Sequence, residues 1–107
     1  MDVASLHSPL AREVIETTNE GRLDDFIALF APDAAVVDGP TYQGLDAIRD
    51  WAQRETFGVQ MHFDVVQENN AEGTSLEVLC ASQGGYSGQA TFDFSIRGSL
   101  IERLEIS

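Results

Sequence analysis

Residues 59–65, with the sequence VQMHFDV, decide the expected fold because apolar and polar side chains alternate along them. In an extended chain, successive side chains point to opposite faces, so a repeat of two places every apolar member on one face. The stretch is therefore predicted to be a half-buried strand. Its inward side chains are Val59, Met61, Phe63 and Val65, and its outward ones are Gln60, His62 and Asp64.

The same alternation continues towards the C-terminus. Residues 76–80 and 90–97 repeat it, separated by the glycine pair Gly84 and Gly85, and a tight turn at Gly98 leads into the last eight residues, LIERLEIS. Short turns between consecutive strands predict an antiparallel meander of four strands. Its further inward side chains are expected to be Leu76, Val78, Cys80, Ala90, Phe92, Phe94 and Ile96.

The N-terminal part of the chain has helical spacing instead. Ser8 followed by Pro9 is typical of a helix start, because serine caps the first amides and proline fits the first turn. This helix is expected to end at Gly21. Its apolar face consists of Leu10, Ala11, Val14, Ile15 and Thr18.

Two more helices are predicted before the meander. One covers about residues 23–30 and ends before Pro32, because proline cannot continue the hydrogen-bond ladder. The other covers about residues 45–57. Between them, residues 34–39 predict a short strand and residues 39–44 a turn and extended link bounded by glycines.

Helices followed by a run of strands predict an α+β protein rather than an alternating α/β one. A chain of 107 residues is too short to bury two cores, so residues 1–107 are expected to form a single domain. Three helices are available to cover the apolar face of a curved, mainly antiparallel sheet. The expected shape is a cone whose open end leaves a cavity.

Composition and charge exclude several classes of function. The chain has 18 acidic and 6 basic residues, a net charge of −12, and all of its basic residues are arginines. Such a surface repels phosphates, so neither nucleic acid nor a membrane is expected as a partner. The absence of lysine excludes Schiff-base chemistry. The N-terminus has no secretory pattern and no apolar run could span a bilayer, so a cytoplasmic location is expected.

Two further stretches carry a resemblance to a known family. Residues 20–39, EGRLDDFIALFAPDAAVVDG, and residues 42–58, YQGLDAIRDWAQRETFG, resemble the N-terminal half of the nuclear transport factor 2-like superfamily. That superfamily includes ketosteroid isomerases and polyketide cyclases of the SnoaL type. The resemblance implies a cystatin-like, cone-shaped fold and a homodimer formed through the sheet. It does not select an activity, because this fold hosts enzymes and binding proteins alike.

The resemblance to the isomerases extends to one catalytic position. Asp38 falls where those enzymes carry a general-base aspartate, and a carboxylate there can abstract a proton beside a carbonyl. Their hydrogen-bonding tyrosines and carboxylic acid correspond here to Val14, Phe30, Ala52 and Phe92, none of which can stabilise an enolate. Ketosteroid isomerase activity itself is therefore not expected.

Each candidate site residue also has a structural interpretation. Asp38, before Gly39 and Pro40, could cap a turn through its side chain instead of entering a pocket. His62 alternates away from the core and is expected at the solvent or a subunit interface, the alternative being a second proton-transfer group opposite Asp38. Residues expected to line the cavity, or simply to pack in the core, are Val14, Phe30, Tyr42, Trp51, Phe92 and Phe94.

Two classes of function remain open. The chain could be a non-catalytic domain that binds a small apolar molecule in its pocket. Alternatively, it could be a cofactor-independent isomerase, dehydratase or cyclase that acts on a small apolar carbonyl compound, with Asp38 as general acid or base. No metal or cofactor is expected, because the sequence contains no ligand-spacing, Walker or dinucleotide motif. Cys80, the only cysteine, is expected to be a small buried thiol.

Overall fold

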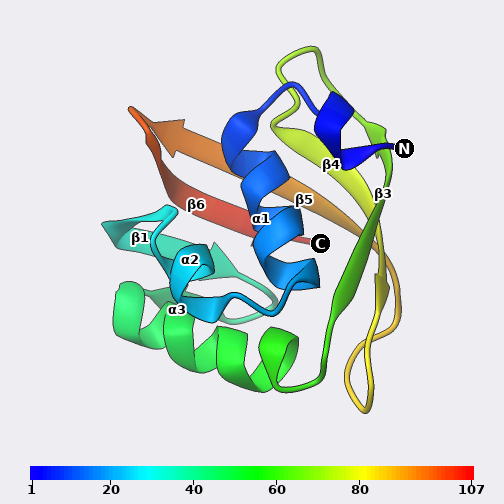
Figure 1. Ribbon diagram of the computed structural model, residues 1–107. Helices are drawn as coiled ribbons and strands as arrows, with labels where there is room; N and C mark the ends of the chain where they lie inside the picture. Colours follow the sequence, from blue (N-terminus) through cyan, green and yellow to red (C-terminus); the bar gives the residue numbers. More distant parts are fainter.

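The computed structural model describes residues 1–107 and shows helices packed on one face of a six-stranded sheet (Figure 1). The predicted α+β class is therefore confirmed. No helix has both the length and the apolar composition needed to cross a membrane. In chain order the elements are a 3-10 turn η1 (Val3–Ser5), α1 (Pro9–Asn19), α2 (Leu23–Ile27), β1 (Phe30–Val37), β2 (Thr41–Gln43), α3 (Leu45–Ala52), a π-helical turn η2 (Gln53–Phe57), β3 (His62–Glu68), β4 (Ser75–Ala81), β5 (Gly88–Arg97) and β6 (Leu100–Ile106).

The strands lie in the order β2-β1-β6-β5-β4-β3. The meander from β3 to β6 is antiparallel throughout, as predicted. Two strands from the N-terminal half extend it: β1 pairs in parallel with β6, and β2 pairs antiparallel with β1. The last strand of the chain therefore lies inside the sheet, between β1 and β5.

The first helix begins and ends as predicted. Ser8 Oγ accepts a hydrogen bond from the amide of Ala11 at 3.2 Å, and Pro9 occupies the first turn. After the helix, Gly21 adopts φ +71°, a left-handed conformation that favours glycine. The buried residues of α1 are Ala11, Val14, Ile15, Thr17 and Thr18.

The second helix is shorter than the predicted 23–30, because Phe30 belongs to the first strand. Helix α2 ends at Ile27, and β1 already begins at Phe30, which pairs with Ile101 of β6. The register between these strands is irregular between Phe30 and Ala35, and Pro32 lies in that interval. A proline is tolerated there because no ladder hydrogen bond is required of it.

The third helix keeps its predicted extent but changes its winding. After Ala52 it continues as a π turn, and Gly58 closes it with a hydrogen bond from its amide to the carbonyl of Gln53 at 2.9 Å. The chain then turns through Gln60, at φ +52°, so β3 starts at His62 rather than at residue 59. The predicted link over residues 39–44 contains the short edge strand β2.

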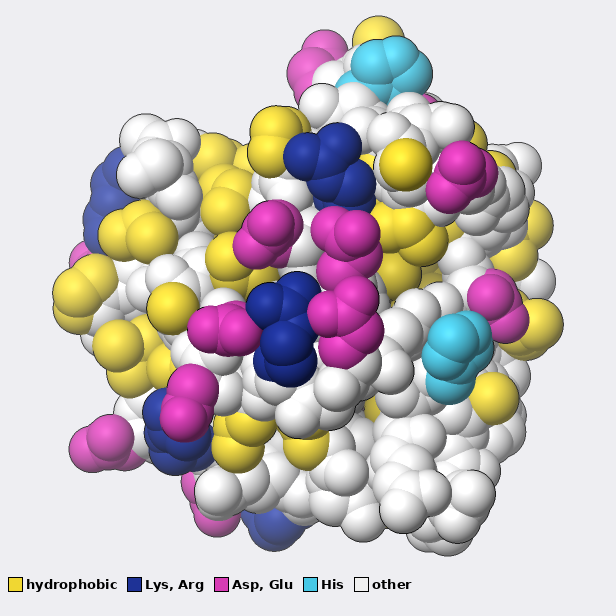
Figure 2. Space-filling view, viewed as in Figure 1, with side chains coloured by type: hydrophobic (Ala, Val, Ile, Leu, Met, Phe, Trp, Pro, Cys, Tyr) yellow, Lys and Arg dark blue, Asp and Glu magenta, His cyan; other side chains and the backbone are white.

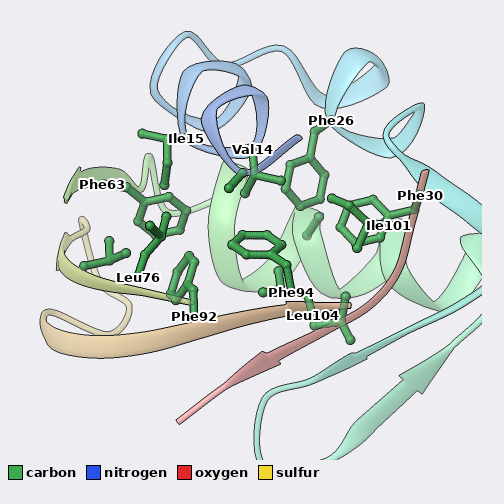
Figure 3. Packing of buried hydrophobic residues seen from close by; sticks show 14 of the residues in the cluster. Val14, Ile15, Phe26, Phe30, Phe63, Leu76, Phe92, Phe94, Ile101 and Leu104 are labelled. Carbon is green, nitrogen blue, oxygen red and sulfur yellow. The ribbon is translucent and has the colours of Figure 1, made fainter. Parts of the chain in front are cut away.

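The core lies between the helices and the concave face of the sheet, and aromatic rings fill much of it. Figure 3 shows Phe92 and Phe94 rising from the sheet towards Val14 on α1. The Phe63 ring meets the Phe92 ring edge-on, with centroids 5.0 Å apart. Ile96 was predicted to share this face, but a register shift between Ser95 and Ile96 leaves it 37% exposed.

One side chain joins the helical layer to the sheet through paired hydrogen bonds. Asn19, at the end of α1, accepts a hydrogen bond from the Phe63 amide at 2.7 Å and donates one to the Phe63 carbonyl at 2.9 Å. These bonds satisfy the backbone of β3 on the side where no further strand pairs with it. Asn19 therefore fixes the position of β3 beneath α1.

We expect Asn19→Ala to lower the free energy of unfolding by about 1–3 kcal/mol, because it leaves a backbone amide and carbonyl without partners. Urea denaturation followed by circular dichroism measures this loss. Gln67→Ala, which removes one exposed side-chain bond to Asn69, is the matched control and should change stability by less than about 0.5 kcal/mol. Equal effects of the two substitutions would contradict this role for Asn19.

Candidate functional site

A cavity of about 250 Å³ lies between α3 with its π turn and the concave face of the sheet. Its wall is mainly apolar, formed by Trp51, Met61, Phe63, Cys80, Tyr86, Ala90, Phe92 and Ile106. The polar members of the wall are Asp38, Glu55, Thr56, Gln89 and Ser107. The cavity wall is thus mainly apolar with a few polar groups, which is the usual composition of a small-molecule site.

The parallel pairing of β1 with β6 brings Asp38 to this cavity. Val37 pairs with Glu105, so both strands end at the same edge of the sheet. The residues that follow, Asp38 after β1 and Ile106 and Ser107 at the end of β6, consequently share the cavity wall. Asp38 enters the site because of strand direction, which no local sequence feature specifies.

The carboxylate of Asp38 is held by one hydrogen bond. Trp51 donates its indole N–H to Asp38 Oδ2 at 3.0 Å. The turn after β1 is closed by the backbone, since the Asp38 amide donates to the Pro40 carbonyl at 2.9 Å. The side chain therefore lies on the cavity side rather than capping the turn, and Oδ1 has no donor from the protein.

Trp51 is supported from behind by a second aromatic ring. Tyr42 of β2 lies with its ring centroid 6.2 Å from that of Trp51, and the Arg54 guanidinium lies 5.8 Å from the Tyr42 centroid. Tyr42 therefore contacts the back of Trp51 and is not part of the cavity wall. This tilted packing of Tyr42 against Trp51 restricts the indole and, through it, the position of the Asp38 carboxylate.

The charged groups of the cavity wall are both acidic. They are Asp38 and Glu55, and no arginine or histidine belongs to the wall. Glu55 is paired with Arg54 at 3.3 Å, whereas Asp38 has no ionic partner. Burial, and secondarily the negative charge of Asp38, raise the pKa of the Cys80 thiol to about 11. A negative potential inside the cavity follows from this distribution.

The hydrogen-bond donors of the wall are largely engaged within the protein. The Tyr86 hydroxyl donates to the Gln89 carbonyl at 2.7 Å, and the Gln89 side-chain amide donates to Glu77 at 3.0 Å. The Trp51 indole donates to Asp38. What the wall presents to a ligand is thus mainly an acceptor, together with the hydroxyl of the buried Thr56.

The structure divides most of the sequence-predicted residues between the cavity wall and the core. Trp51 and Phe92 line the cavity with Asp38. Val14, Phe30 and Phe94 are buried in the core outside its wall.

The His62 side chain is 54% exposed, with Nε2 3.4 Å from Asp64 Oδ1. It belongs to the outward face of β3, as its alternation indicated, and the structure does not bring it to Asp38. A catalytic role for Asp38 stays a prediction. No three His, Cys, Asp or Glu side chains converge as a metal ion would require.

Sequence reasoning missed several residues of the wall. Met61, Phe63, Cys80 and Ala90 were recognised as inward-facing, but nothing in the pattern separates the part of the apolar face that packs from the part that stays open. Tyr86 and Gln89 come from the loop between β4 and β5 and from the start of β5. Glu55 and Thr56 reach the wall through the π turn, a winding often found at functional sites.

Outside the cavity, the charges do not gather into a basic surface. On the face seen in Figure 2, acidic side chains lie next to arginines and are spread over the surface. Exposed ion pairs such as Arg22 with Asp25 and Arg49 with Asp24 account for this pattern. A basic patch that could bind phosphate groups is therefore not found on this face.

The Cys80 thiol should react slowly with iodoacetamide in the folded protein, because the thiolate is the reactive form and its formation is suppressed. The reaction rate is expected to rise with the thiolate fraction and to level off only above about pH 11, the pKa of the folded thiol. Mass spectrometry of the alkylated protein over pH 7–11 measures it, with urea-unfolded protein as the control. The thiol also favours the folded state below its unfolded pKa of about 8.5 and loses that contribution as the pH rises through about 11. Fast labelling of folded protein at pH 8 would contradict this description of the site.

No protein-family model matches the chain, and no curated protein matches it. Several solved structures, in contrast, have a fold similar to that of this chain. A candidate polyketide cyclase from Sinorhizobium meliloti has a TM-score of 0.82 at 23% identity, over 100% of both chains. A protein from Catenulispora acidiphila with a ketosteroid isomerase-like fold, solved in complex with trimethylamine, has a TM-score of 0.77 at 19% identity, over 94% of this chain and 85% of that one.

A computationally designed 17-OHP binder has a TM-score of 0.72 at 12% identity, over 92% of this chain and 86% of the binder. Identities at this level establish the fold and carry no activity with them. Other similar structures include a further protein described as NTF2-like and a candidate ketosteroid isomerase. The chain therefore has the cone-shaped α+β fold of nuclear transport factor 2-like and ketosteroid isomerase-like proteins.

Proposed function

We propose that this chain is a small-molecule-binding domain whose ligand occupies the cavity beside Asp38. The observation that carries the proposal is an apolar cavity with one carboxylate oxygen left free at its wall. Proteins of the same fold are described with ligands as different as 17-OHP and trimethylamine. The similar fold supports a binding role for the cavity without naming its ligand.

The size of the cavity limits that ligand. An engineered cavity of about 150 Å³ binds benzene, and drug-sized ligands occupy pockets of about 300–1,000 Å³. The volume here, about 250 Å³, lies between the two. A compact molecule with one or two rings fits this range, whereas a ligand of steroid size would require the cavity to enlarge.

The alternative function is an isomerase, dehydratase or cyclase that uses Asp38 as general acid or base. The free Oδ1 of Asp38 favours it, because a proton-transfer group needs an unoccupied oxygen facing the substrate. A developing enolate also needs donors, and most side-chain donors of the wall are already engaged with Asp38, Gln89 and Glu77, which leaves mainly the Thr56 hydroxyl. Binding without chemistry is therefore the preferred function.

Filling the cavity should abolish binding without unfolding the protein. Ala90→Phe adds a ring to a wall residue that is 7% exposed, and we expect the affinity for compact apolar fragments to fall at least about tenfold. Binding is measured by NMR titration, and thermal unfolding monitors the fold. Ala28→Phe, at an exposed position on the helical side, is the matched control. Fragments that bind both variants like the parent protein would show that the cavity is not the site.

Asp38→Asn separates the two functions, because it keeps the shape of the side chain and removes its charge. A catalyst should lose at least about 100-fold in turnover of a carbonyl substrate, the usual size of a general-base contribution. A binding domain should keep its affinity for a neutral apolar ligand within about threefold. Turnover assays and NMR titrations on the same two proteins provide both readouts. Turnover that survives the substitution would eliminate Asp38 as the base.

A homodimer formed through the outer face of the sheet is part of the proposal. Apolar side chains of β3 and β4 are exposed in the monomer: Val66 is 51% exposed and Leu79 48% exposed, and Ala81 is exposed two residues after Leu79. Exposed apolar residues on a sheet favour a partner. Since the resemblance of the sequence to the nuclear transport factor 2-like superfamily implies self-association, the occupant proposed is a second copy of this chain.

Leu79→Glu should convert such a dimer into a monomer, because it replaces an exposed apolar side chain of the outer face with a charged one. Sedimentation velocity at micromolar concentration measures the change. The fold should be unaffected, since Leu79 is 48% exposed, and Ala28→Glu on the helical side is the control. A parent protein that already sediments as a monomer at this concentration would overturn the dimer.

A further inference from the structure

We infer that the cavity selects a positively charged ligand: a compact apolar amine, bound in its protonated form with the ammonium group at Asp38. This inference rests on the proposed binding function and adds the chemical class of the ligand. It follows from the charges, acceptors and rings that surround the cavity.

The charge balance of the cavity wall is the first argument. Its ionisable acids are Asp38 and Glu55, and it contains no arginine or histidine that could neutralise Asp38. Glu55 is half-exposed and already paired with Arg54. A carboxylate left without an ionic partner beside an apolar chamber attracts a cation and repels an anion. The net charge of the chain, −12, acts in the same direction.

The hydrogen-bonding capacity of the wall is the second argument. The Trp51 indole fixes Asp38 Oδ2 at 3.0 Å and leaves Oδ1 as an acceptor. The indole, the Tyr86 hydroxyl and the Gln89 amide all donate to groups of the protein. A ligand that supplies a donor to Asp38 is therefore favoured, and a bond from an ammonium group to a carboxylate is about twice as strong as one between neutral groups.

The apolar part of the wall is the third argument. Trp51, Phe63, Phe92 and Tyr86 surround the chamber with aromatic rings, which accept the hydrocarbon body of the ligand. A fully polar cation, such as an inorganic ion, would leave these rings without contacts. An amine with an apolar body satisfies the carboxylate and the rings together.

Three ligands of one shape test the inference: benzylamine, benzyl alcohol and benzoate. They share a ring and differ in carrying a positive, neutral or negative polar group. At pH 7, NMR titration of the full chain is expected to show benzylamine binding at least tenfold more tightly than benzyl alcohol, and no binding of benzoate. Shifts at Cys80 and Ala90 identify the cavity as the site.

Two variants connect the preference to Asp38. Asp38→Asn should reduce the benzylamine affinity at least tenfold and leave benzyl alcohol within about threefold. Asp24→Asn is the matched control, because it makes the same substitution at an exposed acid outside the cavity wall that is already paired with Arg49, and it should keep the preference for the amine. Thermal unfolding of each variant confirms that the fold is retained.

The outcomes separate this inference from the proposed function. Benzyl alcohol or benzoate binding in the cavity as tightly as benzylamine would overturn the inference and leave a binding domain. An amine preference that survives Asp38→Asn would overturn it as well. Failure of all three ligands to bind at millimolar concentration would contradict both the inference and the proposed function.

Discussion

The parallel pairing of β1 with β6 is the constraint on which the rest of the structure depends. All the other strand pairs are antiparallel, and each joins neighbours along the chain. This one pair brings residues about 70 positions apart into register, such as Val36 with Leu104. It docks α2, β1, β2 and α3 onto the meander. Because parallel strands end at the same edge, it also brings Asp38 to the cavity.

The apolar face of the sheet forms both the hydrophobic core and part of the cavity wall. Near α1 it packs completely, and residues such as Leu76, Ile101 and Leu104 are almost wholly buried. Near α3 the same face stays partly open, so Phe63 and Phe92 belong to both the core and the cavity wall. Their edge-on contact gives the wall the rigidity of the core. These packed rings can therefore keep a small cavity open in the folded protein.

Local signals predicted the elements well wherever a repeat or a cap was strong. Ser8 with Pro9 marked the start of α1, and alternation marked β4 and β5. Predictions failed where a distant partner decided the outcome. Phe30 has helical spacing with Phe26, but pairing with β6 makes it the start of a strand. Ile96 continues the alternation of β5, but a register shift against β6 exposes it.

For the candidate site, too, some features follow from the local sequence and others from contacts between distant residues. The sequence by itself determined the α+β class, the inward face of the meander, the acidic charge and the presence of an acid after the first strand, because these depend on residue type and short spacing. Only the tertiary structure decided that Asp38 meets Trp51, that Tyr86 and Glu55 complete the wall, and that Val14, Phe30 and Phe94 pack outside it. These facts depend on strand direction, a π turn and the space left between packed layers, which arise from contacts between residues far apart in the chain.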